Sequence, residues 1–304
     1  MTESPEPYPT ARGVEAAIKA AAKKAAQADP ALDTGKRIQL EYFNRFLSRT
    51  FSEGNESEWV LKGGTGMLAR IPSTRSTHDI DLYLQGFTLN QALADLRRLA
   101  AIDLGDHFRF EYAGHEPSLG DDTQPYADGY RVFFNVFIGV ASKGTVHIDL
   151  VVGAGMTDEI QIMFPKTALD LPRLASNPYR LYPVVDQIAD KVCATMTNYD
   201  GRPSSREKDL VDIVILAATQ DISGTALRLA IETERRRRNM ESFERFTVPS
   251  TWGNGYAKQS KSIPHCADFP TVESASALAS RLIDPAITGE AQGKTWSARN
   301  RQWQ

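Results

Sequence analysis

Three aspartates in two short apolar segments have the residue types and spacing of a metal-dependent phosphoryl-transfer site. In the run DIDLYL, Asp79 and Asp81 alternate with apolar residues, so a strand would place both carboxylates on one face, about 7 Å apart. Asp149 has the same setting in the segment 145–152. Oxygen ligands suit Mg²⁺ or Mn²⁺, and pairs of such ions catalyse phosphoryl transfer. The pattern predicts a metal site formed by Asp79, Asp81 and Asp149.

A glycine-containing turn precedes the first two aspartates. Glycines between a strand and a helix let backbone N–H groups approach a phosphate, and a helix N-terminus attracts anions. No G-K-[ST] follows at the spacing of a Walker loop, so a P-loop is not indicated. Taken alone, such a turn or a D-x-D pair is most often ordinary surface structure, but their succession favours a phosphate cradle. Its predicted residues are Lys62, Gly63, Gly64 and Thr65.

The elements that must position these residues fall into two regions. Alternation of apolar and polar residues predicts strands at 79–84 and 145–152, and a short apolar run that stops at two glycines predicts one at 59–61. Further strand candidates are 108–112 and 130–139. Helical spacing predicts helices at 13–28, 36–51, 65–71, 89–102, 184–198, 206–220, 224–240 and 271–286. A turn-rich loop is expected at 116–129, and a proline-containing linker at 155–183.

This order of elements predicts an α+β protein. A helical leader at 1–34 should precede a catalytic lobe at 35–155, built on a mixed or antiparallel sheet flanked by helices. A mainly helical lobe should occupy 156–304. The 304 residues are enough for one large domain or two modest ones.

Charged residues also border the apolar faces of two C-terminal helices. On the helix predicted at 184–198, Lys191 lies at the margin of the apolar arc. On the helix predicted at 206–220, Arg206 continues the apolar arc, Asp209 borders it, and Asp212 lies further away. A charge in such a position can reach a cleft while its stem is covered, although ordinary surface salt bridging is the alternative. Cys193 projects away from the main arc and is expected to act as a small hydrophobic residue rather than a nucleophile.

The charge balance bears on possible nucleic-acid binding. With 35 Lys and Arg against 38 Asp and Glu, the formal net charge is −3, so a generally basic surface is excluded and any RNA contact must be local. One dense basic run could supply it, although such a run is usually a solvated helix face. The predicted RNA-binding residues are Arg235, Arg236, Arg237 and Arg238.

The cysteine count and the apolar runs of the sequence bear on the cellular compartment. Two cysteines are too few for a disulfide framework, which favours a reducing compartment. No apolar run approaches the roughly 18 residues of a membrane span, and the N-terminal residues lack the pattern of a secretory signal. We therefore expect a soluble cytoplasmic protein without membrane contact.

The run LKGGTGMLARIPSTRSTHDIDLYL resembles the minimal nucleotidyltransferase core of the DNA polymerase β superfamily. More closely, it resembles the AbiEii/AbiGii toxin family, which includes the MenT toxins of mycobacteria. A second block, YPVVDQIADKVCATMTN followed by SSREKDLVDIVIL, supports the narrower resemblance. Together the two blocks and Asp149 span about residues 59–218.

The resemblance implies a metal-dependent nucleotidyltransferase toxin of a type IV-like toxin–antitoxin system. Such an enzyme would transfer NMP from an NTP, CTP or another pyrimidine nucleotide, to the 3′ acceptor end of tRNA, and so block aminoacylation and translation. A cognate antitoxin would be its partner. The implied catalytic residues are Asp79, Asp81, Asp149, Lys191 and Asp209, and the implied nucleotide-binding residues are Lys62, Gly63, Gly64, Thr65, Lys191 and Arg206.

Two other functions stay open at this point. The same chemistry could serve a small-molecule or protein acceptor, as in aminoglycoside nucleotidyltransferases or protein AMPylators. A catalytically silent module that binds nucleotide or antitoxin is the other possibility. Ser76 and Thr77, next to Asp79, suggest a phosphorylation site that would repel the triphosphate, with a simple polar turn as the alternative.

Overall fold

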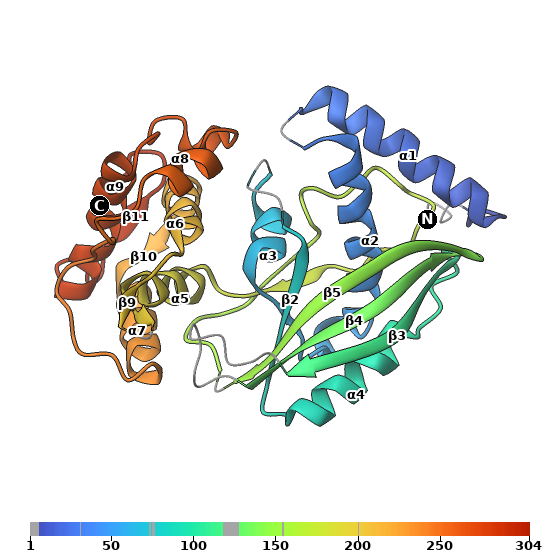
Figure 1. The fold of residues 1–304 in the computed structure, drawn as a ribbon, viewed down its shortest axis with the longest axis horizontal. Helices are drawn as coiled ribbons and strands as arrows, with labels where there is room; N and C mark the ends of the chain where they lie inside the picture. The colour runs from blue at the N-terminus through green and yellow to red at the C-terminus, as the bar shows by residue number, and fades with distance from the viewer. Residues whose placement is uncertain are drawn as a thin grey trace. The chain divides into compact units, whose positions relative to one another are not determined.

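The structure, a computed structural model, describes residues 6–30, 32–72, 74, 77–117, 128–153, 155–199 and 201–304. These residues belong to two compact units, which are considered separately (Figure 1). Of the described residues, the first unit comprises those in 6–117, 128–153 and 161–181, and the second comprises those in 155–160 and 182–304. Ser76 and most of the loop expected at 116–129 lie outside the described residues.

The first unit is built on a mixed sheet of seven strands, in the order β3-β4-β5-β2-β1-β7-β6 among the described residues. Parallel pairing joins β2 to β5 and β1 to β7, and the other neighbours are antiparallel. This confirms the predicted mixed sheet. The strands are β1 (Val60–Leu61), β2 (Asp79–Gln85), β3 (Phe108–Pro117), β4 (Asp128–Ile138), β5 (Ala141–Gly153), β6 (Gln161–Met163) and β7 (Tyr179–Leu181).

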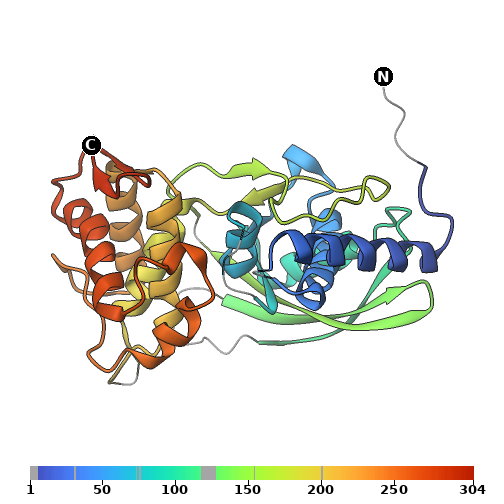
Figure 2. The same ribbon diagram turned by 90° about the horizontal axis from the view of Figure 1, so that it is seen from above.

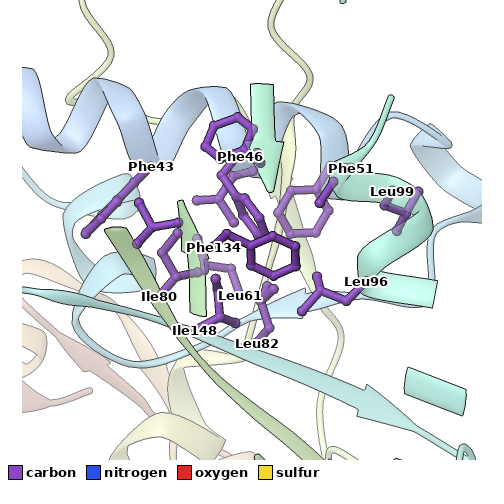
Figure 3. Close-up of a cluster of buried hydrophobic side chains, with 14 of the residues drawn as sticks. Phe43, Phe46, Phe51, Leu61, Ile80, Leu82, Leu96, Leu99, Phe134 and Ile148 are labelled. Carbon is purple, nitrogen blue, oxygen red and sulfur yellow. The ribbon is translucent and has the colours of Figure 1, made fainter. Parts of the chain in front are cut away.

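Helices of the first unit share one apolar core with the sheet. The helices are α1 (Ala11–Ala28), α2 (Thr34–Thr50), α3 (Gly63–Arg70) and α4 (Leu89–Ala100), with a short 3-10 turn at Gly54–Glu56. In two views α1 and α2 lie along the same side of the long strands (Figures 1 and 2). Phe43 and Phe46 of α2 gather with Ile80, Leu82 and Ile148 of the sheet (Figure 3). Burial of these residues fixes which face of each strand points to the core.

Local signals explain where several helices begin. Thr88 and Gln91 form a capping box at the start of α4, and the side chain of Asp33 accepts a hydrogen bond from Lys36 N at the start of α2. These contacts satisfy amide groups that have no acceptor within the helix. Helix α3 ends at Arg70, and its C-cap residue Ile71 has an extended backbone. The next residue is Pro72, which disfavours a helical conformation in the residue before it.

The second unit is mainly helical, as predicted. Its elements are α5 (Val184–Met196), α6 (Glu207–Thr219), α7 (Gly224–Arg237), α8 (Asn254–Ser260), α9 (Val272–Thr288), a 3-10 turn (Pro264–Cys266), the three-stranded sheet of β10 (Ile222–Ser223), β11 (Thr295–Ser297) and β12 (Gln302–Trp303), and the hairpin of β8 (Asn198–Tyr199) and β9 (Arg202–Pro203). Helix α6 lies at the centre, with all its residues from Asp209 to Ala217 buried. Trp296 of β11 is also buried and donates a hydrogen bond to the carbonyl of Ala217.

Three parts of the fold differ from the sequence predictions. The expected linker at 155–183 contains β6 and β7, and β7 pairs with β1 through Leu61 and Leu181. Strands of three residues are too short to show a readable alternation. The helical leader is part of the first unit, since Val14 and Ile18 of α1 lie in its core. Residues 155–160 belong to the second unit, but 161–181 return to the first, so the chain does not divide once at residue 155.

Other expectations concern the cysteines and membrane contact. Cys193 and Cys266 are both free and buried, and burial raises the pKa of the Cys266 thiol to about 12 and that of Cys193 further. Neither thiol is therefore ionised at neutral pH, which agrees with the prediction that Cys193 is not a nucleophile. Within the described ranges, no helix combines the length and apolar character that a membrane span requires.

Candidate active site

The parallel pairing of β2 with β5 brings the three predicted metal-binding aspartates onto one face of the sheet. Asp81 is in register with Asp149, and Asp79 is in register with His147. The intervening residues Ile80 and Ile148 are fully buried in the core. Because side chains alternate along a strand, the carboxylates point to the opposite face. Neighbouring strands lie about 4.8 Å apart, so Asp81 and Asp149 are adjacent.

An arginine that the sequence analysis missed occupies the same face. Arg131 of β4 is in register with Asp149, and its Nε and Nη2 donate to the two carboxylate oxygens at 2.8 and 3.0 Å. Hydrogen bonding to Asp149 and the charge of that carboxylate raise the pKa of Arg131, with smaller contributions from Asp79 and Asp81. The alternation along β4 indicated on which face of a strand Arg131 would lie, but only the strand register shows that Arg131 pairs with Asp149.

The donor set of this face suits Mg²⁺ or Mn²⁺, because it consists of carboxylates held on two adjacent strands. As they lie, however, no three His, Cys, Asp or Glu side chains converge closely enough to hold a metal, within the part of the chain that the structure describes. Asp149 is engaged by Arg131 instead. Of the two nearby histidines, His147 reaches within 3.6 Å of Asp79, whereas His78 is exposed.

The glycine turn between β1 and α3 packs directly against the second aspartate. Gly63 has a φ of +59°, a conformation that favours glycine, and a Cβ at this position would overlap the carboxylate of Asp81. Backbone bonding fixes the same contact, since Lys62 N donates to the Asp81 carbonyl at 2.8 Å. Thr65 anchors the start of α3 to β2 by donating from its hydroxyl to the Asp79 carbonyl at 2.8 Å. The predicted cradle therefore adjoins Asp79 and Asp81.

Gly63→Ala is expected to lower the nucleotide transfer implied by the sequence resemblance about 100-fold, because the added methyl must displace the Asp81 carboxylate. Stability should fall by about 1–3 kcal/mol, from the positive φ and the overlap together. Gly54→Ala is the matched control, since Gly54 has a φ of +60° and a Cβ added there would meet no atom within 4 Å. Initial rates and urea unfolding check both variants; equal effects on transfer would contradict the close contact with Asp81.

In the second unit, Lys191 of α5 forms a buried charge cluster with residues at and near the start of α6. Its Nζ lies 2.6 Å from Asp212 Oδ2 and 3.3 Å from Asp209 Oδ1. Arg206, just before α6, bonds the second oxygen of Asp209 through its Nε. Burial alone would raise the pKa of Asp209, but the charges of Lys191 and Arg206 outweigh this effect and hold that pKa at about 2. Two cations thus neutralise two carboxylates.

The placement of Asp212 corrects the sequence analysis, which put it away from the apolar arc. Asp209 and Asp212 are both 0% exposed, and Lys191 is 8% exposed. The periodicity of α6 was misleading because the helix is covered on several sides by other elements, among them α5, α8 and α9. A central helix has no solvent face from which a charged residue's environment can be inferred. Asp209, which borders the arc as predicted, also pairs with Lys191.

The four arginines at the end of α7 do not form one solvated face. Arg235 and Arg236 both pair with Glu232, Arg237 donates to the Gly155 carbonyl at 2.8 Å, and Arg238 is buried against Glu234. Glutamates three and four residues earlier explain this division, because such spacings bring side chains together on a helix. Arg236 is the most exposed of the four, with 73% of its side chain accessible. An RNA-binding role for the run stays a prediction.

Of the two residues suggested as phosphorylation sites, Thr77 lies within the described residues. Its hydroxyl donates to the Asp79 carbonyl at 3.3 Å. The same carbonyl accepts the hydroxyl of Thr65. Both threonines thus contact the backbone of the residue that begins β2.

The mixed sheet, the in-register aspartates and the adjoining glycine turn agree with the nucleotidyltransferase core that the sequence resembles. The family model for the nucleotidyl transferase AbiEii toxin of type IV toxin–antitoxin systems matches residues 45–293. The chain belongs to this family, as the sequence analysis expected. Membership implies a cognate antitoxin partner. The match extends well beyond residue 218, where the recognised motifs end.

Solved structures of low sequence identity are also similar. The MenT4 nucleotidyltransferase toxin from Mycobacterium tuberculosis is 12% identical, with a TM-score of 0.49 over 89% of this chain and 98% of that one. JHP933 from Helicobacter pylori is 14% identical, with a TM-score of 0.42 over 84% of this chain and 94% of that one. No curated protein matches the sequence. The family assignment therefore rests on the family model.

Proposed function

We propose that this nucleotidyltransferase toxin is metal-dependent and transfers NMP from an NTP to the 3′ acceptor end of tRNA. CTP or another pyrimidine nucleotide is the proposed donor, and loss of aminoacylation and translation is the proposed consequence. The observation that carries the proposal is the register of Asp81 with Asp149 on adjacent parallel strands, with Asp79 on the same face. The contact of Gly63 with Asp81 joins a potential phosphate cradle to these carboxylates.

In this proposal Asp79, Asp81 and Asp149 hold Mg²⁺ or Mn²⁺. When bound, the metal ions would neutralise charge on the triphosphate and lower the pKa of the attacking hydroxyl. Asp149 could also accept the proton of that hydroxyl as it attacks the α-phosphate. Pyrophosphate is the leaving group.

Residues of the turn would bind the phosphates of the donor nucleotide. Gly63, Gly64 and Thr65 are the first three residues of α3, and backbone amides at a helix N-terminus favour a bound anion. They can donate to phosphate oxygens, and the helix dipole adds favourable charge. Lys62, whose Nζ lies 5.3 Å from the centre of the Tyr83 ring, is proposed to add a cation.

The charge cluster of the second unit supplies the remaining proposed residues. Lys191 and Arg206 are assigned to phosphate binding, and Asp209 to holding both cations in place. Support comes from the hydrogen bonds that Asp209 accepts from each of them. Asp212, which lies closest to Lys191, would share this positioning role.

An acceptor panel tests the proposal. The full chain is incubated with each α-labelled NTP and Mg²⁺, together with total tRNA, an aminoglycoside or a protein mixture. We expect label in tRNA only. Label in the small molecule or protein would favour the first alternative, and nucleotide binding without pyrophosphate release would favour a silent module. Absence of transfer to any acceptor with any NTP would count against the proposal.

Arg236→Glu is expected to weaken tRNA binding about tenfold at physiological salt and to leave NTP affinity unchanged. Arg236 and Arg228 line a groove of about 500 Å³ in the second unit, together with residues of α7, α9 and 242–244. A guanidinium in this position can bind a phosphate, so its loss should also reduce the salt dependence of binding. Filter binding at several salt concentrations checks this.

Arg299→Glu is the matched control, because Arg299 is exposed and lies outside that groove. Equal effects of the two charge reversals would indicate general electrostatics rather than a local RNA contact. Arg238 is unsuitable for this test because it is buried against Glu234.

Regulation by phosphorylation is part of the proposal. A phosphate on Thr77 would replace its hydrogen bond to the Asp79 backbone with a group of about −1.5 to −2 charge. Modification of Ser76, the preceding residue, would add similar charge. Either change would repel an incoming triphosphate.

A further inference from the structure

The ion pair between Arg131 and Asp149 is a contact on the carboxylate face that the proposed reaction does not use. It is bidentate, with each carboxylate oxygen of Asp149 accepting from a different nitrogen of Arg131. Both partners are accessible, at 46% for the Arg131 side chain and 26% for that of Asp149. The pair is therefore free to separate without uncovering the core.

Three carboxylates on adjacent strands repel one another unless a cation balances them. Arg131 supplies a positive charge at that face, and it does so through the same carboxylate that is proposed to bind the second metal. A divalent cation that approaches Asp149 must compete with the guanidinium for its oxygens.

We propose that Arg131 is a positioning residue that holds Asp149 while no divalent cation is bound, and that cation binding displaces it. Arg131 thereby sets the affinity of the site for metal. The inference rests on the proposed metal site, but its test measures binding of Mn²⁺ alone and needs neither nucleotide nor transfer.

The experiment is a titration of the full chain with Mn²⁺ at constant ionic strength, with free Mn²⁺ measured by electron paramagnetic resonance. Arg131→Gln is expected to bind Mn²⁺ about tenfold more tightly than the wild type, because an exposed bidentate pair and a nearby like charge are both removed. Arg131→Lys keeps the charge but loses the planar fork, so an intermediate affinity is expected.

Arg109→Gln is the matched control. Arg109 belongs to the same sheet, is similarly exposed at 54%, and also pairs with an acidic residue, Glu111. It is in register with Phe137, six residues along β4 from Arg131, or about 20 Å away. That distance exceeds the Debye length of about 8 Å, so Mn²⁺ affinity should not change.

The double variant Arg131→Gln/Asp149→Asn separates competition from a general structural effect. Compared with Asp149→Asn alone, the double variant should gain much less affinity than Arg131→Gln gains over the wild type, because only the like-charge effect is left; a merely structural role of Arg131 would not predict this difference. Binding of Mn²⁺ by Arg131→Gln with wild-type or weaker affinity would overturn this inference and leave the proposed function standing. Absence of Mn²⁺ binding in every variant would overturn the proposed metal site as well.

Discussion

Asp81→Asn is expected to reduce nucleotide transfer about 10³-fold while leaving the fold intact. The Asp81 carboxylate points away from the core, beside Gly63 and in register with Asp149, so an isosteric amide should be accommodated. The neutral amide lacks the negative charge with which the Asp81 carboxylate is proposed to bind the metal ion. Loss of several kcal/mol of stabilisation at such a site corresponds to this factor. Steady-state release of pyrophosphate checks the rate, and circular dichroism checks the fold.

Glu111→Gln is the control for Asp81→Asn. Glu111 is an exposed carboxylate of the same sheet, on β3, and its partner is Arg109. Glu111→Gln removes one negative charge from the same unit, as Asp81→Asn does, but away from the proposed site. Transfer should therefore change less than twofold. Retention of transfer within tenfold by Asp81→Asn would contradict the assignment of this residue to the metal.

Lys191→Met is expected to destabilise the protein by about 3–5 kcal/mol and to abolish transfer. The substitution leaves Asp212 buried without its cation, 2.6 Å from where the ammonium was, and Asp209 with Arg206 alone. Removal of one partner from a buried ion pair is costly because the remaining charge stays out of water. Urea unfolding measures the loss of stability.

The double variant Lys191→Met/Asp212→Leu separates stability from function. Replacing both buried partners with apolar groups should recover most of the stability, but transfer should stay absent if Lys191 binds phosphate. Recovery of transfer in the double variant would show that the charge of Lys191 is not needed. Wild-type stability of Lys191→Met would contradict the buried cluster.

The carboxylate face could be predicted because its signal is local. Apolar residues alternate with Asp79 and Asp81, and again with Asp149, and burial of the apolar set fixes the face on which the acids lie. The motif near Gly63 added the order turn, helix, strand, which the structure confirms. Recognition of the family depended on these same residues, and the family model bears it out.

The features that the sequence did not reveal depend on long-range pairing. Arg131 meets Asp149 only because β4 and β5 pair in one register, and Asp212 is buried only because other helices cover α6. Neither fact can be obtained from the period of a single element. The same holds for β7, whose three residues are recognisable as a strand only beside Leu61 of β1.

Buried charges are the hardest class to place. Arg49 of α2 forms a fully buried bidentate pair with Asp106 and also donates to the carbonyls of Ile102 and Phe108. Nothing in the helical pattern distinguishes it from a solvated arginine. In the opposite direction, the run Arg235–Arg238 suggested a common basic face, but neighbouring glutamates and burial divide it.

Transfer of a nucleotide to tRNA is tested most directly by mass spectrometry of a purified tRNA, measured both intact and after digestion. The tRNA is incubated with the full chain, Mg²⁺ and each NTP in turn, then digested so that its 3′ fragment can be identified. We expect a mass gain of whole nucleotidyl units, confined to the 3′ fragment, and no gain with Asp81→Asn. Unchanged mass of every tRNA tested with all four NTPs, or a gain elsewhere in the molecule, would contradict the proposed transfer.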